Sequence, residues 1–163
     1  MFNVLFVCTG NSARSIMAEA ILNTYAGDRF KAFSAGSSPA EEVHPKTLEL
    51  LREAKINTEG LRSKSWNEFS GDKAPPLDLI ITVCDKAKGE TCPIWAGNPV
   101  TAHWGIEDPV EKWAQGDESG FRKTMRFLEN RIRLLAELPD DKLEHLKLKQ
   151  HLEKIAALAN EVE

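Results

Sequence analysis

The sequence predicts a single α/β domain in which helices cover a parallel β-sheet. Its 163 residues suit one domain with a self-supporting core. Short apolar runs, typical of buried strands, alternate with segments whose apolar residues recur every three or four positions, as on a helix face. This alternation implies parallel strands joined by right-handed crossovers, and no repeat or linker divides the chain. We therefore expect one α/β sandwich spanning residues 1–163.

The first half of the chain holds two predicted strand–helix units. Residues 2–7 form an apolar run that ends in a tight turn, and residues 31–35 form a weaker strand closed by residues 36–39. A second helix begins near Pro45 and carries Leu48, Leu51 and Ala54. The first helix, which Gly27 should cap, is predicted from the spacing of Ala13, Ile16, Met17, Ala20, Ile21 and Tyr25.

The second half begins with the clearest strand and becomes helical toward its end. Residues 77–83 form that strand, which runs into Cys84, and residues 101–104 form a fourth. From about Ser119 one helix presents an apolar face made of Phe121, Met125, Leu128, Ile132 and Leu135. Pro139 interrupts it, and a further helical stripe follows, made of Leu148, Leu152, Ile155, Ala159 and Val162.

Composition and charge exclude several classes of protein. The hydrophobic share of 42% and the charged share of 28% are those of a globular protein. With 21 Lys and Arg against 25 Asp and Glu, and no basic block, we expect neither nucleic acid nor an anionic membrane as a partner. The apolar runs are too short to span a bilayer, and residues 1–7 lack the features of a signal peptide. We therefore expect a cytoplasmic protein.

The three cysteines suggest chemistry rather than structural disulfides. An odd count excludes a full set of intrachain disulfides, and in a reducing cytosol cysteines more often react than staple a fold.

An eight-residue segment after the first strand combines groups that bind and attack a tetrahedral oxyanion. It is the Cys-x5-Arg-Ser motif from Cys8 to Ser15. The five residues between Cys8 and Arg14, which let backbone N–H groups point inward at a helix N-terminus, are Thr9, Gly10, Asn11, Ser12 and Ala13. The planar guanidinium of Arg14 can grip two anion oxygens.

Within this segment Cys8 is the expected nucleophile. A helix terminus and a nearby cation lower a cysteine pKa, which favours the thiolate. An ordinary thiol is roughly 3% ionised at pH 7, so complete ionisation gains only about 30-fold in rate. Donors that stabilise the oxyanion should therefore contribute more, and Ser15 could hydrogen-bond the Cys8 sulfur. The alternative is an inert, buried Cys8 with Arg14 on the helix surface.

A thiolate that attacks an oxyanion centre needs an acid to protonate the group that leaves. Asp108 lies on a loop after the last predicted strand. Loops at the carboxyl ends of parallel strands gather at one edge of the sheet, which is the edge that carries Cys8. We therefore assign the acid to Asp108, with Glu107 as the competitor and a simple Asp-Pro turn as the structural alternative.

The other two cysteines stand close together in the sequence. Seven residues separate Cys84 from Cys92. If the strand before Cys84 lies beside the strand before Cys8, the backbones are ~4.8 Å apart, which permits a disulfide. Cys92 could then attack Cys84 and pass the disulfide to an external thiol. Simple packing is one alternative, and a zinc site with His103 is another, although the spacing matches no CxxC-type site.

Two enzyme classes and one carrier class fit these residues. A phosphate-ester hydrolase needs Cys8, Arg14 and Asp108 but has no use for further thiols, whereas a reductase needs the two electrons that a dithiol supplies. A phosphocarrier or anion sensor would need no acid such as Asp108. The three cysteines therefore favour a reductase.

The chain resembles the thiol-dependent arsenate reductases of the low-molecular-weight tyrosine phosphatase fold. The segments that carry the resemblance anchor nearly all of residues 2–138 and are Cys8–Ser15, Ser34–Gly36, Ser63–Trp66, Asp78–Pro93, His103–Gly105 and Asp108–Pro109. The Cys-x5-Arg-Ser turn is common to reductases and phosphatases. The segment with Cys84 and Cys92, followed by His103–Gly105, resembles the reductase branch.

The resemblance implies a three-layer sandwich with a four-stranded parallel sheet in the order 2-1-3-4. Residues 140–162 then form a helical extension beyond the family's core. It also implies reduction of arsenate to arsenite, with phosphate or sulfate as mimics. Cys8 is the nucleophile, Arg14 the oxyanion clamp, Asp108 the acid, and Cys84 and Cys92 the first and second resolving thiols. The runner-up is a phosphatase acting on phosphotyrosine or another small phosphomonoester.

The resemblance has further implications for the loop, its cofactors and its partners. Asn11 should hold the turn open from a left-handed conformation. Some members bind potassium beside this turn, and Asn11, Glu19 and Ser34 match that site, but Asn67 stands where a carboxylate is expected. No other metal and no cofactor is expected. Thioredoxin or glutaredoxin with glutathione should regenerate the thiols, since the long gap between the resolving cysteines leaves the donor open. We expect a monomer.

Overall fold

A four-stranded parallel sheet forms the centre of the molecule. The computed structural model describes residues 1–83, 97 and 99–146. The strands are β1 (Phe2–Cys8), β2 (Phe30–Gly36), β3 (Leu79–Thr82) and β4 (Val100–His103), in the order β2-β1-β3-β4. The predicted order 2-1-3-4 is therefore confirmed, and each strand lies within two residues of its predicted bounds. β1 is central, which explains why residues 4–8 are all buried.

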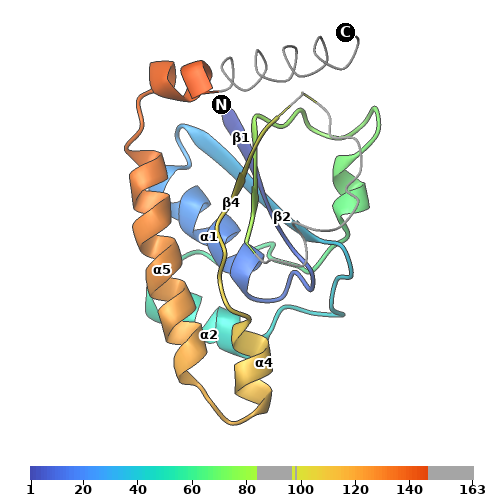
Figure 1. Cartoon of the computed structure of the whole chain (residues 1–163), viewed down its shortest axis with the longest axis vertical. Coiled ribbons are helices and arrows are strands. Elements are labelled where there is room, and N and C mark those ends of the chain that lie inside the picture. The colour runs from blue at the N-terminus through green and yellow to red at the C-terminus, as the bar shows by residue number, and fades with distance from the viewer. Residues whose placement is uncertain (84–96, 98, 147–163) are drawn as a thin grey trace, which may run out of the picture.

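Helices cover both faces of this sheet (Figure 1). α1 (Arg14–Ala26) and α5 (Ser119–Ala136) pack side by side. On β2, Ser34 hydrogen-bonds Glu19 of α1, whereas the Phe33 ring contacts Phe69 of the 3-10 helix η1 (Trp66–Phe69). Successive strand residues face opposite sides, so η1 lies on the face opposite α1. The three-layer arrangement agrees with the prediction.

α1 is buried on more sides than the single apolar face that the sequence predicted. Ile16, Met17, Ala20 and Ile21 are buried as expected, but the residues between them are buried as well. The sheet covers one side of the helix and α5 covers another, so apolar residues surround it. Tyr25, which was expected on the buried face, is 47% exposed instead. Gly27 occupies the C-cap position with ordinary right-handed dihedrals.

α2 (Pro45–Glu53) begins at the predicted proline but buries a different set of residues. Leu51 is buried as expected, whereas Leu48 is only half-buried. Ala54 is exposed because the helix ends one residue before it. His44 caps the helix, since its Nδ1 accepts a hydrogen bond from the Lys46 N–H.

The sequence did not predict η1 or α4 (Pro109–Ala114). Both are short, and the sequence around Pro109 indicated only a turn. Asp108 caps α4 through a hydrogen bond from the Val110 N–H to its Oδ1, 2.9 Å long. A short helix held by one cap and one proline leaves little periodic signal.

The face of α5 was predicted correctly, because all five of its marker residues are buried. After Pro139, residues 140–146 are helical and Leu143 is 3% exposed. Arg29 holds this junction by donating to the carbonyl oxygens of Ala136 and Leu138. The stripe from Leu148 to Val162 lies outside the described residues. Within the described part of the chain, no helix is long and apolar enough to cross a membrane.

Shortening a leucine side chain on the buried face of α5 should destabilise the protein more than shortening one on its exposed face. Leu128 is fully buried, and Leu134 on the same helix is 63% exposed. We expect Leu128→Ala to lower the free energy of unfolding by about 2–5 kcal/mol, because it leaves a cavity between α5 and the core. Leu134→Ala should change it by less than about 0.5 kcal/mol. Urea denaturation measures both, and equal effects would contradict the packing described.

Candidate functional site

Residues Cys8–Arg14, here called the oxyanion loop, join the end of β1 to the start of α1. Among the described residues no side chain caps the N-terminus of α1, and its first turn contains no acidic residue. Helix N-termini carry N–H groups without intrahelical partners and a partial positive charge. The start of α1 therefore offers these groups to an anion rather than to a side chain of its own.

Asn11 gives the loop its shape. Its φ is 48°, in the left-handed region that asparagine tolerates better than most residues. The side chain is fully buried, and it donates from Nδ2 to Ser15 Oγ over 2.7 Å. Its Oδ1 accepts from the Lys64 N–H at 2.9 Å, and its carbonyl oxygen accepts from Ser63 Oγ at 2.7 Å. The expected left-handed turn is thus held by residues 63 and 64, far away in the sequence.

Gly36 at the end of β2 allows the loop to approach closely. A Cβ at this position would lie 2.4 Å from the Thr9 carbonyl oxygen, so any side chain would push the loop away. This contact gives a reason for the glycine in the Ser34–Gly36 segment. A Cβ on Gly10, by contrast, would meet only Ser12 Oγ at 3.8 Å, so the loop has room for a methyl group there.

The sulfur of Cys8 lies beneath the loop, where it contacts Ser15 and Asn11. Ser15 Oγ is 2.8 Å from Sγ, and the Asn11 N–H donates to Sγ over 3.1 Å. Burial raises the pKa of the Cys8 thiol, and the Ser15 hydrogen bond, the Arg14 charge and the Asn11 N–H oppose this rise. The expected lowering of the pKa is therefore absent in this structure, because loss of water around the sulfur outweighs the donors.

Arg14 and Cys8 line one cavity, and two contacts hold the Arg14 side chain in place there. Its Nη1 donates to the carbonyl oxygen of Ile106 at 2.9 Å, and its side chain is 11% exposed. Its Nη2 lies 3.8 Å from Asp108 Oδ2. The guanidinium is thus oriented before any anion arrives, which reduces the entropy lost when it grips one.

Asp108 and Glu107 both line this cavity but have different partners. Asp108 uses Oδ1 to cap α4, while Oδ2 faces Arg14, and the side chain is 40% exposed. Glu107 is 80% exposed and pairs with Lys112, whose hydrogen bond lowers the pKa of the Glu107 carboxyl. The structure thus brings Cys8, Arg14, Ser15 and Asp108 together at one sheet edge, as the sequence predicted.

The cavity itself is about 460 Å³, and none of its described lining residues is aromatic. One wall is the oxyanion loop, and the opposite wall comes from the segment after β4. Besides Cys8–Arg14, the lining residues are Ala40, Ile106, Glu107, Asp108, Val110 and Glu111.

Cys84 and Cys92 lie outside the described residues, so their predicted roles stay predictions. What the structure does place is the end of the strand that precedes Cys84. β3 runs parallel beside β1, Thr82 pairs with Val7, and the Val83 N–H donates to the Val7 carbonyl over 2.9 Å. The two strands that lead to Cys8 and Cys84 are therefore neighbours in the same direction, as the expected sulfur relay requires.

Two of the three residues matched to a potassium site, Glu19 and Ser34, already contact a cation of the chain itself. Asn11, Glu19 and Ser34 are buried, and Ser34 Oγ donates to Glu19 Oε1 over 2.9 Å. The Lys64 ammonium lies 3.6 Å from Glu19 Oε1 and 3.4 Å from Ser34 Oγ. A potassium ion on these oxygens would meet the ammonium charge, so the residues present do not fit the ion. No cluster of three metal-binding side chains occurs in residues 1–83 and 99–146.

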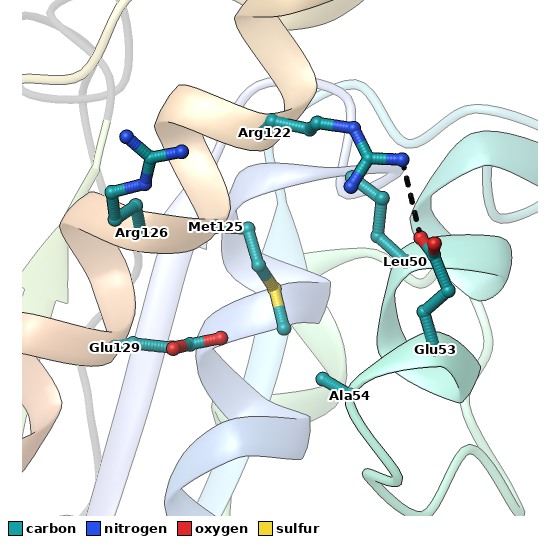
Figure 2. A pocket seen from close by; sticks show the side chains of 7 residues that line it. All are labelled: Leu50, Glu53, Ala54, Arg122, Met125, Arg126 and Glu129. Atoms are coloured by element: carbon teal, nitrogen blue, oxygen red, sulfur yellow. Dashed lines mark hydrogen bonds and ion pairs between the residues drawn. The ribbon is translucent and has the colours of Figure 1, made fainter.

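A second cavity of about 310 Å³ lies between α2 and α5 (Figure 2). Arg122 and Glu53 point toward each other there, with Nη2 and Oε2 3.4 Å apart. Met125 and Leu50 supply apolar surface beside this exposed pair. The seven described residues that line it include neither a nucleophile nor a residue of the oxyanion loop.

Sequence reasoning missed the supports of the loop. Lys64 and Ser63 belong to a segment that carried the resemblance, but their contacts with Asn11 and Glu19 join positions far apart in the chain. Ile106 contributes a backbone carbonyl, which leaves no mark on residue choice. A tertiary contact map could have revealed these partners, whereas spacing along the chain could not.

The fold and this loop define a class: an α/β protein that binds a tetrahedral oxyanion above a buried cysteine. Residues 3–151 match the family described as low molecular weight phosphotyrosine protein phosphatase, and the chain belongs to that family. The resemblance drawn from the residues is therefore confirmed.

Within the family, similar proteins carry the name arsenate reductase. One from Halalkalibacterium halodurans is 34% identical over 141 residues, which are 82% of this chain and 94% of that protein. A crystal structure of arsenate reductase from Archaeoglobus fulgidus superposes with a TM-score of 0.66 at 34% identity, covering 83% of this chain and 99% of that one. The thioredoxin-dependent arsenate reductase of Corynebacterium glutamicum superposes with a TM-score of 0.64 at 30% identity. This match covers 91% of this chain and 63% of that one.

Removing the Ser15 hydroxyl should raise the pKa of Cys8 further. The hydrogen bond to Ser15 is the largest influence that lowers this pKa. In Ser15→Ala, the rate of Cys8 alkylation by iodoacetamide, followed by peptide mass spectrometry, should reach half its maximum at a higher pH than in the wild type. The exposed Ser38 offers a matched control, and Ser38→Ala should leave the profile in place. A shift to lower pH in Ser15→Ala would contradict the assignment.

Proposed function

We propose that this chain is an arsenate reductase in which Cys8 attacks arsenate and a relay of thiols returns the electrons. The observation that carries the proposal is the convergence of the Cys8 sulfur, the open start of α1 and the Arg14 guanidinium on one cavity. The relatives named arsenate reductase cover most of the chain and support the same reaction.

In the first step the Cys8 thiolate attacks the arsenic(V) centre of arsenate. A sulfur–arsenic bond forms and an arsenic–oxygen bond breaks, so hydroxide leaves, or water if Asp108 donates a proton. Arg14 and the loop N–H groups neutralise the oxygens. We assign the acid to Asp108 rather than to Glu107, because Asp108 Oδ2 faces the Arg14 guanidinium in the cavity, whereas Glu107 is 80% exposed and pairs with Lys112.

In the second step Cys84 attacks the sulfur of Cys8. A disulfide forms between the two cysteines, the sulfur–arsenic bond breaks, and its electron pair leaves with arsenic as arsenite. The two thiols have then lost two electrons, and arsenic(V) has gained two. Cys92 next attacks Cys84, which frees Cys8 and leaves a Cys84–Cys92 disulfide for an external dithiol to reduce.

The external reductant we propose is a thioredoxin-type dithiol, since the Corynebacterium glutamicum relative is thioredoxin-dependent. Glutaredoxin with glutathione is the alternative donor. The enzyme would act as a monomer in the cytoplasm, with no potassium ion required at Glu19.

The runner-up, a phosphatase, shares the first step, with phosphorus in place of arsenic and water as the second attacker. The described lining of the cavity favours the reductase. Glu107 and Glu111 line it and would repel a second anionic group of a larger ester.

Loss of the first resolving thiol should separate the two activities. We expect Cys84→Ser to abolish arsenate turnover, because arsenic stays bound to Cys8, and to leave any hydrolysis of p-nitrophenyl phosphate unchanged. NADPH consumption with thioredoxin and thioredoxin reductase measures the first activity, and nitrophenol absorbance the second. The glutathione and glutaredoxin pair is tested in parallel. Unimpaired arsenate turnover in Cys84→Ser would refute the relay.

Replacing Asp108 by asparagine should slow the first step without disturbing the helix. Asparagine still caps α4, so the fold stays intact, but its amide group is not acidic and cannot act as a general acid. We expect kcat to fall by roughly 10²–10⁴-fold, in the range of a lost general acid. Glu107→Gln provides the control and should change kcat little. If the Glu107 variant lost more activity than the Asp108 variant, the assignments would be reversed.

A further inference from the structure

We propose that Lys64 is a positioning residue, whose ammonium group supplies from within the chain the positive charge that the back of the oxyanion loop needs. The inference rests on the proposed oxyanion site, but not on which oxyanion reacts there. It explains why the residues that could have held a potassium ion do not fit one in this chain.

The backbone of Lys64 is part of the framework behind the loop. Its carbonyl oxygen accepts from the Gly36 N–H at 2.9 Å, and the next residue, Ser65, forms a parallel bridge with Gly36. Its own N–H donates to Asn11 Oδ1 over 2.9 Å. Lys64 is therefore attached both to the end of β2 and to the residue that shapes the loop.

The side chain of Lys64 reaches inward from this anchor. Its Nζ lies 3.6 Å from Glu19 Oε1 and 3.4 Å from Ser34 Oγ, and it donates to the Arg62 carbonyl oxygen over 2.9 Å. The Lys64 and Glu19 side chains are 9% and 12% exposed. A charge pair this deeply placed is screened little by salt, and removing one partner leaves the other charge without compensation.

Burial and pairing act against each other on both groups. Burial raises the pKa of the Glu19 carboxyl, and the Lys64 charge opposes that rise. Burial lowers the pKa of the Lys64 ammonium, and the Glu19 charge opposes that fall. Arg62 and Glu68 are the other charged groups that act on Lys64, and they pair with each other at the surface.

The pair matters to the anion because of where Glu19 lies. It follows Ser15 by four positions on α1, so both side chains lie on one face of the helix. The Ser15 hydroxyl contacts the Cys8 sulfur and accepts a hydrogen bond from the Asn11 side-chain amide. An uncompensated carboxylate one turn away would oppose both a thiolate and a bound oxyanion, and Lys64 cancels that charge.

Without the ammonium, two oxygen donors would remain at this position. They are the Glu19 carboxylate and the Ser34 hydroxyl, which hydrogen-bond each other over 2.9 Å, and such groups suit a hard cation. Removal of the Lys64 charge should therefore create a dependence on potassium that the wild type lacks. A residue that only filled space would create no such dependence.

Calorimetric titration with inorganic phosphate, in potassium chloride and in choline chloride, tests this directly. We expect the wild-type affinity to be the same in both salts. Lys64→Met keeps the backbone N–H and should bind phosphate about tenfold more weakly in choline chloride, with recovery in potassium chloride. Lys73→Met removes the same charge from an exposed position and should match the wild type. Equal affinity of Lys64→Met and the wild type in choline chloride would overturn the proposal.

A double variant keeps the test decisive if Lys64→Met does not fold. In Glu19→Gln with Lys64→Met neither member of the pair is charged, so this protein should fold, bind phosphate better than the single variant and ignore potassium. A double variant as impaired as Lys64→Met would count against the proposal. Phosphate binding needs no electron transfer, so a chain that showed this pattern yet reduced no arsenate would refute the proposed function and leave the role of Lys64 standing.

Discussion

The whole site depends on one constraint: a loop that turns its N–H groups toward an anion must be held from behind by other groups. Asn11 is the residue through which these groups hold the loop. Its left-handed backbone directs the turn, its amide reaches Ser15 on one side and Lys64 on the other, and Ser63 binds its carbonyl. Because Gly36 has no side chain, the end of β2 can pack closely against the Thr9 carbonyl of the loop. Oxyanion recognition at Cys8 is therefore a property of residues 34–36 and 63–65 as much as of the motif itself.

This arrangement also accounts for the state of the cysteine. The sulfur is buried below the loop, and burial raises its pKa despite the opposing hydrogen bonds from Ser15 and Asn11 and the Arg14 charge. The chemistry then depends on donors that are already in place for the oxyanion, as expected when electrostatic preorganisation supplies most of the rate. Arg14, held by the Ile106 carbonyl, belongs to the same prepared set.

Much of the fold could be predicted from the sequence because its signals are local. The apolar runs of β1 and β3 and the periodic face of α5 have one interpretation each, and the Cys-x5-Arg-Ser motif fixes the strand–loop–helix order. α1 misled the prediction at Tyr25, since a helix covered on several sides has no single face. The Lys64–Glu19 pair and the Arg14–Ile106 bond could not be predicted, because they join distant segments through single contacts. The roles predicted for Cys84 and Cys92 rest on the sequence alone.

In the proposed reaction, electrons leave the protein through a series of sulfur atoms that begins with Cys8 at the oxyanion loop. Peptide mass spectrometry of the fully reduced enzyme after a single turnover with arsenate, without any external thiol, tests it most directly. We expect one arsenite released per chain and a Cys84–Cys92 disulfide with Cys8 reduced. A protein that released no trivalent arsenic and kept all three cysteines as thiols, while hydrolysing phosphomonoesters, would contradict it.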